Sequence, residues 1–128
     1  HQAALPAETR HGTFVAPTVI EIDAVSDLPG EVFGPVLHVL RYRREDMVAV
    51  VPAVNATGFG LTFGLHSRIE DHWELMSEQV EVGNCYINRN MTGAVVGVQP
   101  FGGEGLSGTG PKAGGPHYLQ RFAIEQGL

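Results

Sequence analysis

Cysteine, basic residues and long hydrophobic runs are all scarce in this chain of 128 residues. One cysteine allows neither a disulfide framework nor a Cys-rich zinc site. Eight Lys and Arg against 14 Asp and Glu give a net charge of -6, which argues against nucleic acid and anionic membranes as partners. No stretch approaches the length of a transmembrane helix, and residues 1–10 lack the apolar segment of a signal peptide. We therefore expect a cytoplasmic location, and we expect this segment to bind neither nucleic acid nor membrane.

The composition that remains is typical of a folded protein. Hydrophobic residues make up 43% of the chain and charged residues 17%, so residues 1–128 are expected to form a single domain with a core of fair size. The chain begins with His1 and not with Met. We therefore interpret it as a fragment of a longer protein.

Strands and helices are expected to alternate along the chain. The β-rich runs predict strands at residues 13–22, 36–42, 61–66 and 84–88, although Pro17 places the first at an edge or a bulge. Helices are predicted at residues 45–55, where Pro52 counts against the prediction, and from the capping-box pair Ser67 and Glu70 to just before Gly83. A closing helix is predicted at residues 117–125, with Pro116 at its start. The pattern predicts an α/β fold with a mostly parallel sheet flanked by helices.

A stretch at residues 89–115 interrupts this alternation. It contains too many glycines, and too many prolines that break secondary structure, to form a regular helix or strand. Loops this long in compact domains are usually functional or disordered, and we favour a functional loop. Residues 103–108 match the G-x-G-x-x-G spacing of dinucleotide-binding turns, but no strand precedes them and no helix follows. A P-loop is excluded as well, because Pro111 lies between the second glycine and Lys112.

Four segments resemble sequence elements of one enzyme superfamily, and they occur in the same order along the chain. Residues 31–36, 55–61, 83–88 and 100–108 are similar to the E-x-F-G-P-V, A-N-x-T-x-Y-G-L, G-x-x-x-x-N and P-F-G-G…S-G elements of the aldehyde dehydrogenase superfamily. Residues 88–103 closely resemble the substrate-anchor segment of glutamate γ-semialdehyde (Δ1-pyrroline-5-carboxylate) dehydrogenases, especially those fused behind a proline dehydrogenase in bifunctional proline-utilization proteins. The resemblance implies the C-terminal portion of an aldehyde dehydrogenase catalytic domain.

That resemblance implies an activity of the parent protein. A cysteine thiolate attacks the aldehyde, hydride passes to NAD, and a glutamate-activated water releases glutamate. The family's nucleophile and general base lie upstream of this chain, so the chain alone is expected to be inactive. FAD would belong only to a fused proline dehydrogenase outside the chain. Expected partners are the small-molecule substrate, the rest of the parent polypeptide and further copies of it; the alternative is a noncatalytic aldehyde-dehydrogenase-like assembly domain of a long proline-utilization protein.

Five residues match functional positions of the resembled enzymes. Glu31 matches the glutamate that accepts hydrogen bonds from the nicotinamide ribose, and Phe33 the aromatic beside the nicotinamide ring. Gly93 and Ala94 match positions whose backbone N–H groups hold the substrate α-carboxylate, where small side chains allow close approach. Phe101 matches the aromatic that packs on the aliphatic part of the substrate. Without the resemblance, Glu31 would be a solvated loop carboxylate, Phe33 a core aromatic, and the other three an ordinary turn with Phe101 buried.

Other reactive side chains are expected to have no catalytic or metal-binding role. Cys85 lies within a predicted strand without an activating neighbour in sequence, so we interpret it as a buried small hydrophobe and not as a nucleophile. His66 and His72 are six residues apart and straddle a predicted helix start, which does not suit a shared metal ion. No residue of this chain is therefore expected to be catalytic or to bind a metal.

Overall fold

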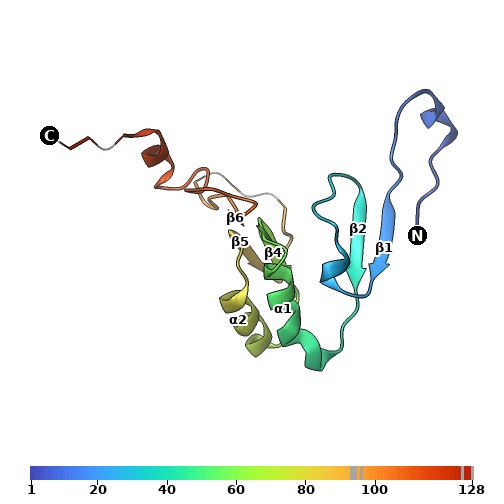
Figure 1. Ribbon diagram of the computed structural model, residues 1–128, viewed down its shortest axis with the longest axis horizontal. Helices are drawn as coiled ribbons and strands as arrows, with labels where there is room; N and C mark the ends of the chain where they lie inside the picture. The colour runs from blue at the N-terminus through green and yellow to red at the C-terminus, as the bar shows by residue number, and fades with distance from the viewer. Residues whose placement is uncertain (93–94, 96, 125, 128) are drawn as a thin grey trace. The chain divides into compact units, whose positions relative to one another are not determined.

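A computed structural model describes residues 1–92, 95, 97–124 and 126–127 of the chain. The chain divides into two compact units, His1–Val50 and Val51–Leu128. Figure 1 labels both α-helices and most of the strands.

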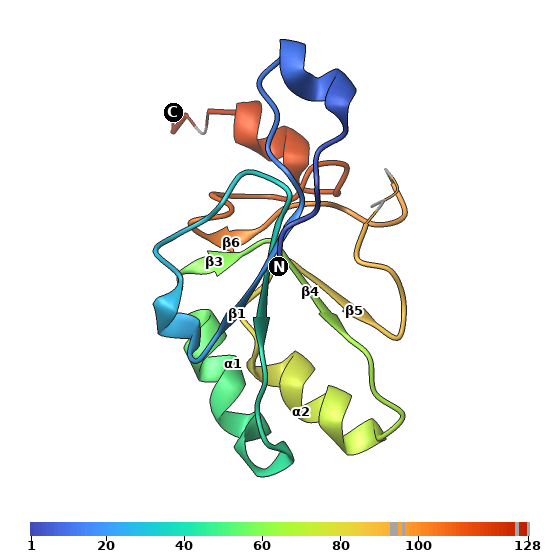
Figure 2. The same ribbon diagram turned by 90° about the vertical axis from the view of Figure 1, so that its right-hand side faces the viewer.

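A parallel strand pair forms the centre of the first unit. β1 (Thr18–Ile22) pairs with β2 (Val36–Leu40) in a register that joins Thr18 to Val36. Two short 3-10 helices, η1 (Ala7–His11) and η2 (Val25–Asp27), precede and follow β1. β1 starts directly after Pro17, later than the sequence predicted, because proline has no N–H to give to a ladder. The path from the N-terminus to β2 can be followed in Figure 2.

The second unit contains a β-α-β crossover. β4 (Thr62–Leu65) and β5 (Asn84–Ile87) pair in parallel, and α2 (Glu70–Gln79) connects them. α1 (Met47–Asn55) follows the 3-10 helix η3 (Arg44–Asp46) and crosses the boundary between the units. α1 and α2 lie side by side in both views (Figures 1 and 2). Two parallel strand pairs with helices confirm the predicted α/β class, although each pair is a separate two-stranded sheet here.

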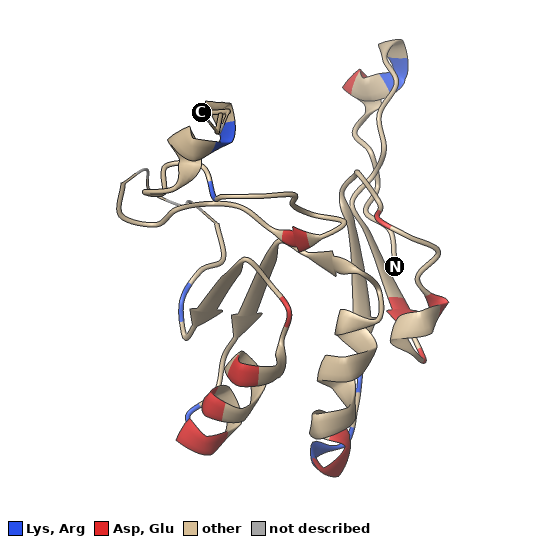
Figure 3. Ribbon diagram, turned by 60° about the vertical axis from the view of Figure 1, so that its left-hand side comes forward, with Lys and Arg blue, Asp and Glu red and all other residues tan. Residues whose placement is uncertain are grey.

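The hydrophobic core of the second unit is small. Val51 of α1, Met76 of α2, Val80 after it and Tyr86 of β5 are buried. Met76 and Val80 are four residues apart, as expected for one side of a helix and its end. By contrast, the solvent-facing positions of α2 carry acidic residues, visible in red along this helix in Figure 3.

Three local predictions were wrong. Ser67 does not cap α2, because the helix begins after Ile69 and the Ser67 hydroxyl bonds instead to the Ile69 backbone. The predicted closing helix is only the 3-10 helix η4 (Tyr118–Phe122). The glycine-rich stretch contains β6 (Glu104–Gly105), which pairs antiparallel with β3 (Phe59–Gly60).

Candidate functional site

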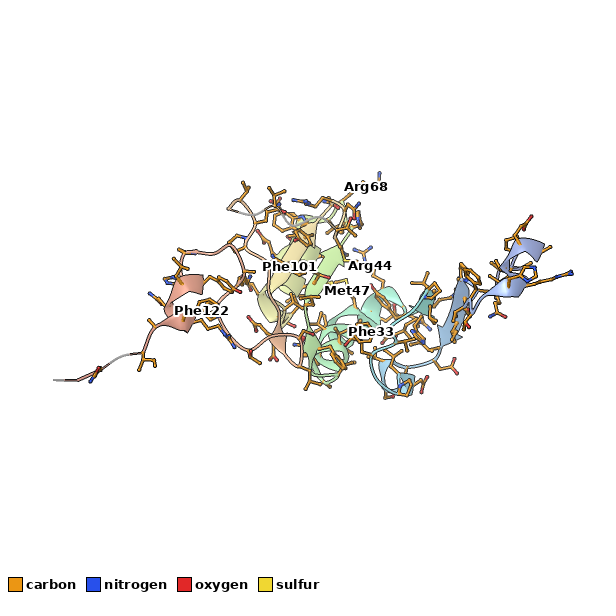
Figure 4. All side chains as sticks on the ribbon, turned by 90° about the horizontal axis from the view of Figure 1, so that it is seen from above. Phe33, Arg44, Met47, Arg68, Phe101 and Phe122 are labelled. Atoms are coloured by element: carbon orange, nitrogen blue, oxygen red, sulfur yellow. The ribbon has the colours of Figure 1, made fainter. Side chains whose placement is uncertain are left out.

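Glu31 and Phe33 lie on the loop between η2 and β2 in the first unit. The Asp27 carboxylate closes η2, which precedes this loop, by accepting the N–H groups of Asp23 (3.1 Å) and Ala24 (2.8 Å). Gly30, with φ at +149°, allows the chain a turn that other residues rarely adopt. Beyond it both Glu31 and Phe33 are exposed, and 92% of Phe33 is accessible. Phe33 is labelled in Figure 4. The loop thus presents a carboxylate and an aromatic ring without covering either.

Both side chains fit a role in holding a dinucleotide. The two ion pairs among the described residues join Arg41 to Glu21 and Arg43 to Glu45, so the Glu31 carboxylate is available to accept hydrogen bonds from hydroxyl groups. Within this chain the Phe33 side chain lies outside the core in which the sequence alone would have placed it. A phenyl ring this exposed offers a flat apolar surface against which another ring can pack.

The glycine-rich stretch is attached closely to β5 and the residues before it. A Cβ at Gly83 would collide with the Gly102 carbonyl, and one at Gly108 would collide with that of Gly103. Only glycine permits backbones to approach this closely. The Ser107 hydroxyl accepts the N–H of Gly60 (3.1 Å) from the neighbouring β3. These contacts give the P-F-G-G…S-G pattern a structural reason.

Phe101 sits at the centre of the attached region. Its N–H donates to the carbonyl of Ala113 (3.0 Å), and the Ala113 N–H donates back to the carbonyl of Phe101 (2.8 Å). Phe101, labelled in Figure 4, is nevertheless exposed, with 40% of the residue accessible. A turn with a buried Phe101 is therefore not what the structure shows, and the ring is accessible for contact with a ligand.

Two side chains that hold this region were not identified from the sequence. Asn84, the first residue of β5, bonds to the backbone of Pro100 and Gly102, and the Lys112 ammonium donates to the Gly83 carbonyl. The only signal for Asn84 was its place next to Gly83 in the G-x-x-x-x-N segment. In the sequence, Lys112 stands out only as a lysine that does not fit a P-loop.

Gly93 and Ala94, the expected carboxylate anchor, lie outside the described residues. Just before them, the Asn90 side chain accepts both the N–H and the hydroxyl of Thr92, each at 2.9 Å. The Arg89 guanidinium lies 4.9 Å from the ring centre of Tyr86, a cation–π contact. A cation therefore stands at the start of the segment that leads to the expected anion site.

Cys85 lies in β5 as predicted, but it is exposed, so the interpretation as a buried residue was wrong. The strand's alternation buries the next residue, Tyr86, and leaves Cys85 on the other face. Partial burial still raises the pKa of the Cys85 thiol, which lowers its thiolate fraction and does not suit a nucleophile. Within the described ranges, no cluster of three or more His, Cys, Asp or Glu could hold a metal.

No helix in the described part of the chain is long and apolar enough to cross a membrane.

The chain is similar to known proteins of one family. The family model described as aldehyde dehydrogenase family matches residues 2–126. Bifunctional protein PutA of Rhizobium meliloti is 63% identical over 121 residues, which cover 94% of this chain and 10% of that protein. A 1-pyrroline-5-carboxylate dehydrogenase of Bacillus thuringiensis is 43% identical over 111 residues, covering 84% of this chain and 21% of that protein. The chain thus spans from a tenth to a fifth of the length of these relatives.

Solved structures of proteins with the same names are also similar to this chain. A crystal structure of a Bradyrhizobium japonicum proline utilization A variant aligns with a TM-score of 0.85 and 63% identity, covering 90% of this chain and 12% of that one. A 1-pyrroline-5-carboxylate dehydrogenase structure aligns with a TM-score of 0.75 and 44% identity, covering 84% and 21%. The family match over residues 2–126, together with the E-x-F-G-P-V and P-F-G-G…S-G segments, shows that the chain belongs to the aldehyde dehydrogenase family.

Proposed function

We propose that this chain is the C-terminal part of the catalytic region of an NAD-dependent L-glutamate γ-semialdehyde dehydrogenase, which produces glutamate in proline catabolism. The observation that carries the proposal is the accessible Phe101 ring on a backbone held at both sides, within a segment that resembles the substrate anchor of these enzymes. The names of the relatives, PutA and 1-pyrroline-5-carboxylate dehydrogenase, support the same substrate.

In this proposal the residues of this chain bind and orient the substrate. The backbone N–H groups of Gly93 and Ala94 hold the α-carboxylate of the substrate, because amides can bind an anion without a formal charge. The Phe101 ring packs against the aliphatic carbons between the carboxylate and the aldehyde. Holding both ends of a short substrate places its aldehyde in a defined position, which contributes to rate through orientation.

Glu31 and Phe33 hold the nicotinamide end of the cofactor. The Glu31 carboxylate accepts hydrogen bonds from the ribose hydroxyls, and the Phe33 ring packs beside the nicotinamide. When bound, NAD supplies the hydride acceptor for aldehyde oxidation. The nucleophile and general base are supplied by other parts of the complete protein, together with FAD chemistry if a proline dehydrogenase is fused to it. We further propose that the complete protein acts in the cytoplasm and that copies of it assemble.

The test is the substrate selectivity of the complete protein that contains this chain. Initial rates of NAD reduction are measured with glutamate γ-semialdehyde and with an unsubstituted aldehyde of the same carbon length. We expect a much higher kcat/KM for the semialdehyde, because only that substrate has a carboxylate for the Gly93–Ala94 amides. Equal values for both aldehydes would contradict a carboxylate anchor and the assignment of this substrate.

A further inference from the structure

Three asparagines of the second unit each bond two backbone groups through one carboxamide. They are Asn55, Asn84 and Asn88. In Asn84 the side-chain nitrogen donates to the carbonyl of Pro100 (3.0 Å), and the side-chain oxygen accepts the N–H of Gly102 (3.3 Å). One carboxamide therefore forms hydrogen bonds with the residues on both sides of Phe101.

The backbone of residues 100–102 is consequently held from two directions. Asn84 holds Pro100 and Gly102, and the backbone of Ala113 holds Phe101 itself through a pair of hydrogen bonds. The residue Phe101 is not buried, since 40% of it is exposed. Fixing a backbone while its aromatic side chain is left accessible reduces the conformational entropy that the ring would lose on contact with a ligand.

We propose that Asn84 is a positioning residue for the substrate: it sets the direction of the Phe101 ring and thereby the affinity for the aliphatic part of the semialdehyde. This inference rests on the proposed function. Asn84 touches neither substrate nor cofactor in this proposal and acts only through Phe101. Its removal should therefore raise the KM for the semialdehyde and leave the KM for NAD unchanged.

A purely structural role is the competing explanation, and the chain contains a matched control for it. The side-chain nitrogen of Asn55 donates to the Gln79 carbonyl (2.8 Å), and its oxygen accepts the N–H of Glu81 (3.0 Å). Asn55 thus joins the end of α1 to the end of α2 with the same pair of bonds that Asn84 makes. None of its partners belongs to the glycine-rich stretch.

The experiment compares Asn84→Leu with Asn55→Leu in the complete protein. Leucine keeps the approximate shape of asparagine and removes both bonds. We expect Asn84→Leu to raise the KM for the semialdehyde about tenfold, and Asn55→Leu to lower thermal stability without that rise. In a Phe101→Ala background, Asn84→Leu should raise the KM for the semialdehyde little further. A residue that acts through Phe101 has no effect on KM once the Phe101 ring is removed. Equal KM changes in the two single variants, or additive losses in the double variant, would overturn the proposal.

Hydrogen exchange tests the same inference without substrate. Asn84→Leu should accelerate exchange of the amides in residues 101–103, whereas Asn55→Leu should not; unchanged exchange in Asn84→Leu would overturn the positioning role. This measurement separates the two proposals, since a wild-type protein inactive on the semialdehyde would refute the proposed function while exchange still decides whether Asn84 holds the loop. If Asn84→Leu does not fold, Asn84→Asp takes its place, because it keeps the shape and the acceptor for Gly102 but loses the donor to Pro100. Asn84→Asp should raise the KM for the semialdehyde and accelerate exchange, as Asn84→Leu does, but both effects should be smaller.

Discussion

Glu31 is an exposed carboxylate that lies two residues before an almost fully exposed phenylalanine. Replacement of Glu31 by alanine in the complete protein should remove charge-assisted hydrogen bonds to the ribose and cost about 1.5–3 kcal/mol of cofactor or transition-state stabilisation. Fold stability should hardly change, because the side chain is solvated. Steady-state kinetics with NAD as the varied substrate measure the effect. Unaltered kinetics would favour the solvated-loop interpretation.

Ala94 is the residue at which the carboxylate anchor can be tested through its backbone. Ala94→Pro removes one N–H and should lower kcat/KM for the semialdehyde about ten- to a hundredfold, the usual cost of a hydrogen bond to a charged group. An aldehyde without a carboxylate should lose much less. Proline also restricts the backbone, so a bulky variant, Ala94→Leu, serves as control: it keeps the N–H but blocks the substrate's approach. Equal losses for both aldehydes in both variants would indicate disruption of the loop and not loss of an anchor.

At the scale of elements, the glycine-rich stretch can pack against the residue before β5 only because that residue, Gly83, has no side chain. Gly83→Ala would place a methyl group against the Gly102 carbonyl and the Gly103 backbone. Overpacking against backbone should destabilise the fold by about 1–3 kcal/mol. Thermal denaturation of the complete protein would reveal a lower midpoint. Gly34→Ala is the control, since a Cβ there meets nothing within 4 Å; the same midpoint shift in both variants would argue against close packing at Gly83.

Hydrophobic periodicity was enough to predict the main elements of the crossover. Ile69, Trp73, Met76 and Val80 recur at helical intervals, which predicts a helix where α2 lies, and Met76 and Val80 are buried. The short β3–β6 pair could not be predicted, because its partners lie far apart in the sequence and each strand has two residues. The start of α2 was predicted incorrectly, because Ser67 bonds to the next turn of backbone and not to the helix.

The candidate site was predictable only in part, for a related reason. Glu31, Phe33 and Phe101 stand in motifs whose residues are consecutive, so a resemblance could identify them. Whether their side chains are exposed depends on tertiary packing, which reversed the prediction for Cys85. The role of Asn84 depends on partners 16 and 18 residues away, and such a contact leaves no local pattern in the sequence.

At the scale of the whole molecule, much apolar surface is left uncovered in both units. The side chains concerned include Phe14, Val15, Leu37, Val98, Leu106, Leu119, Phe122 and Ile124. Exposed apolar residues in such number are typical of surfaces that other protein covers. This is in keeping with the small share of the relatives' length that the chain spans.

The isolated 128-residue chain should therefore not oxidise glutamate γ-semialdehyde. The family's nucleophile and base are expected upstream of Glu31, and Cys85, with its raised pKa, is a poor substitute. Purified chain is mixed with the semialdehyde and NAD, and absorbance of the reduced cofactor is followed against a blank. Turnover above the blank would mean that the catalytic groups lie within this chain.

The most direct test of the central claim is to quantify both products formed by the complete protein from glutamate γ-semialdehyde and NAD. We expect glutamate and reduced NAD in equal amounts, formed continuously over many turnovers, because each aldehyde oxidised transfers one hydride. Formation of neither product by a folded protein would contradict the claim and would favour the noncatalytic assembly domain instead.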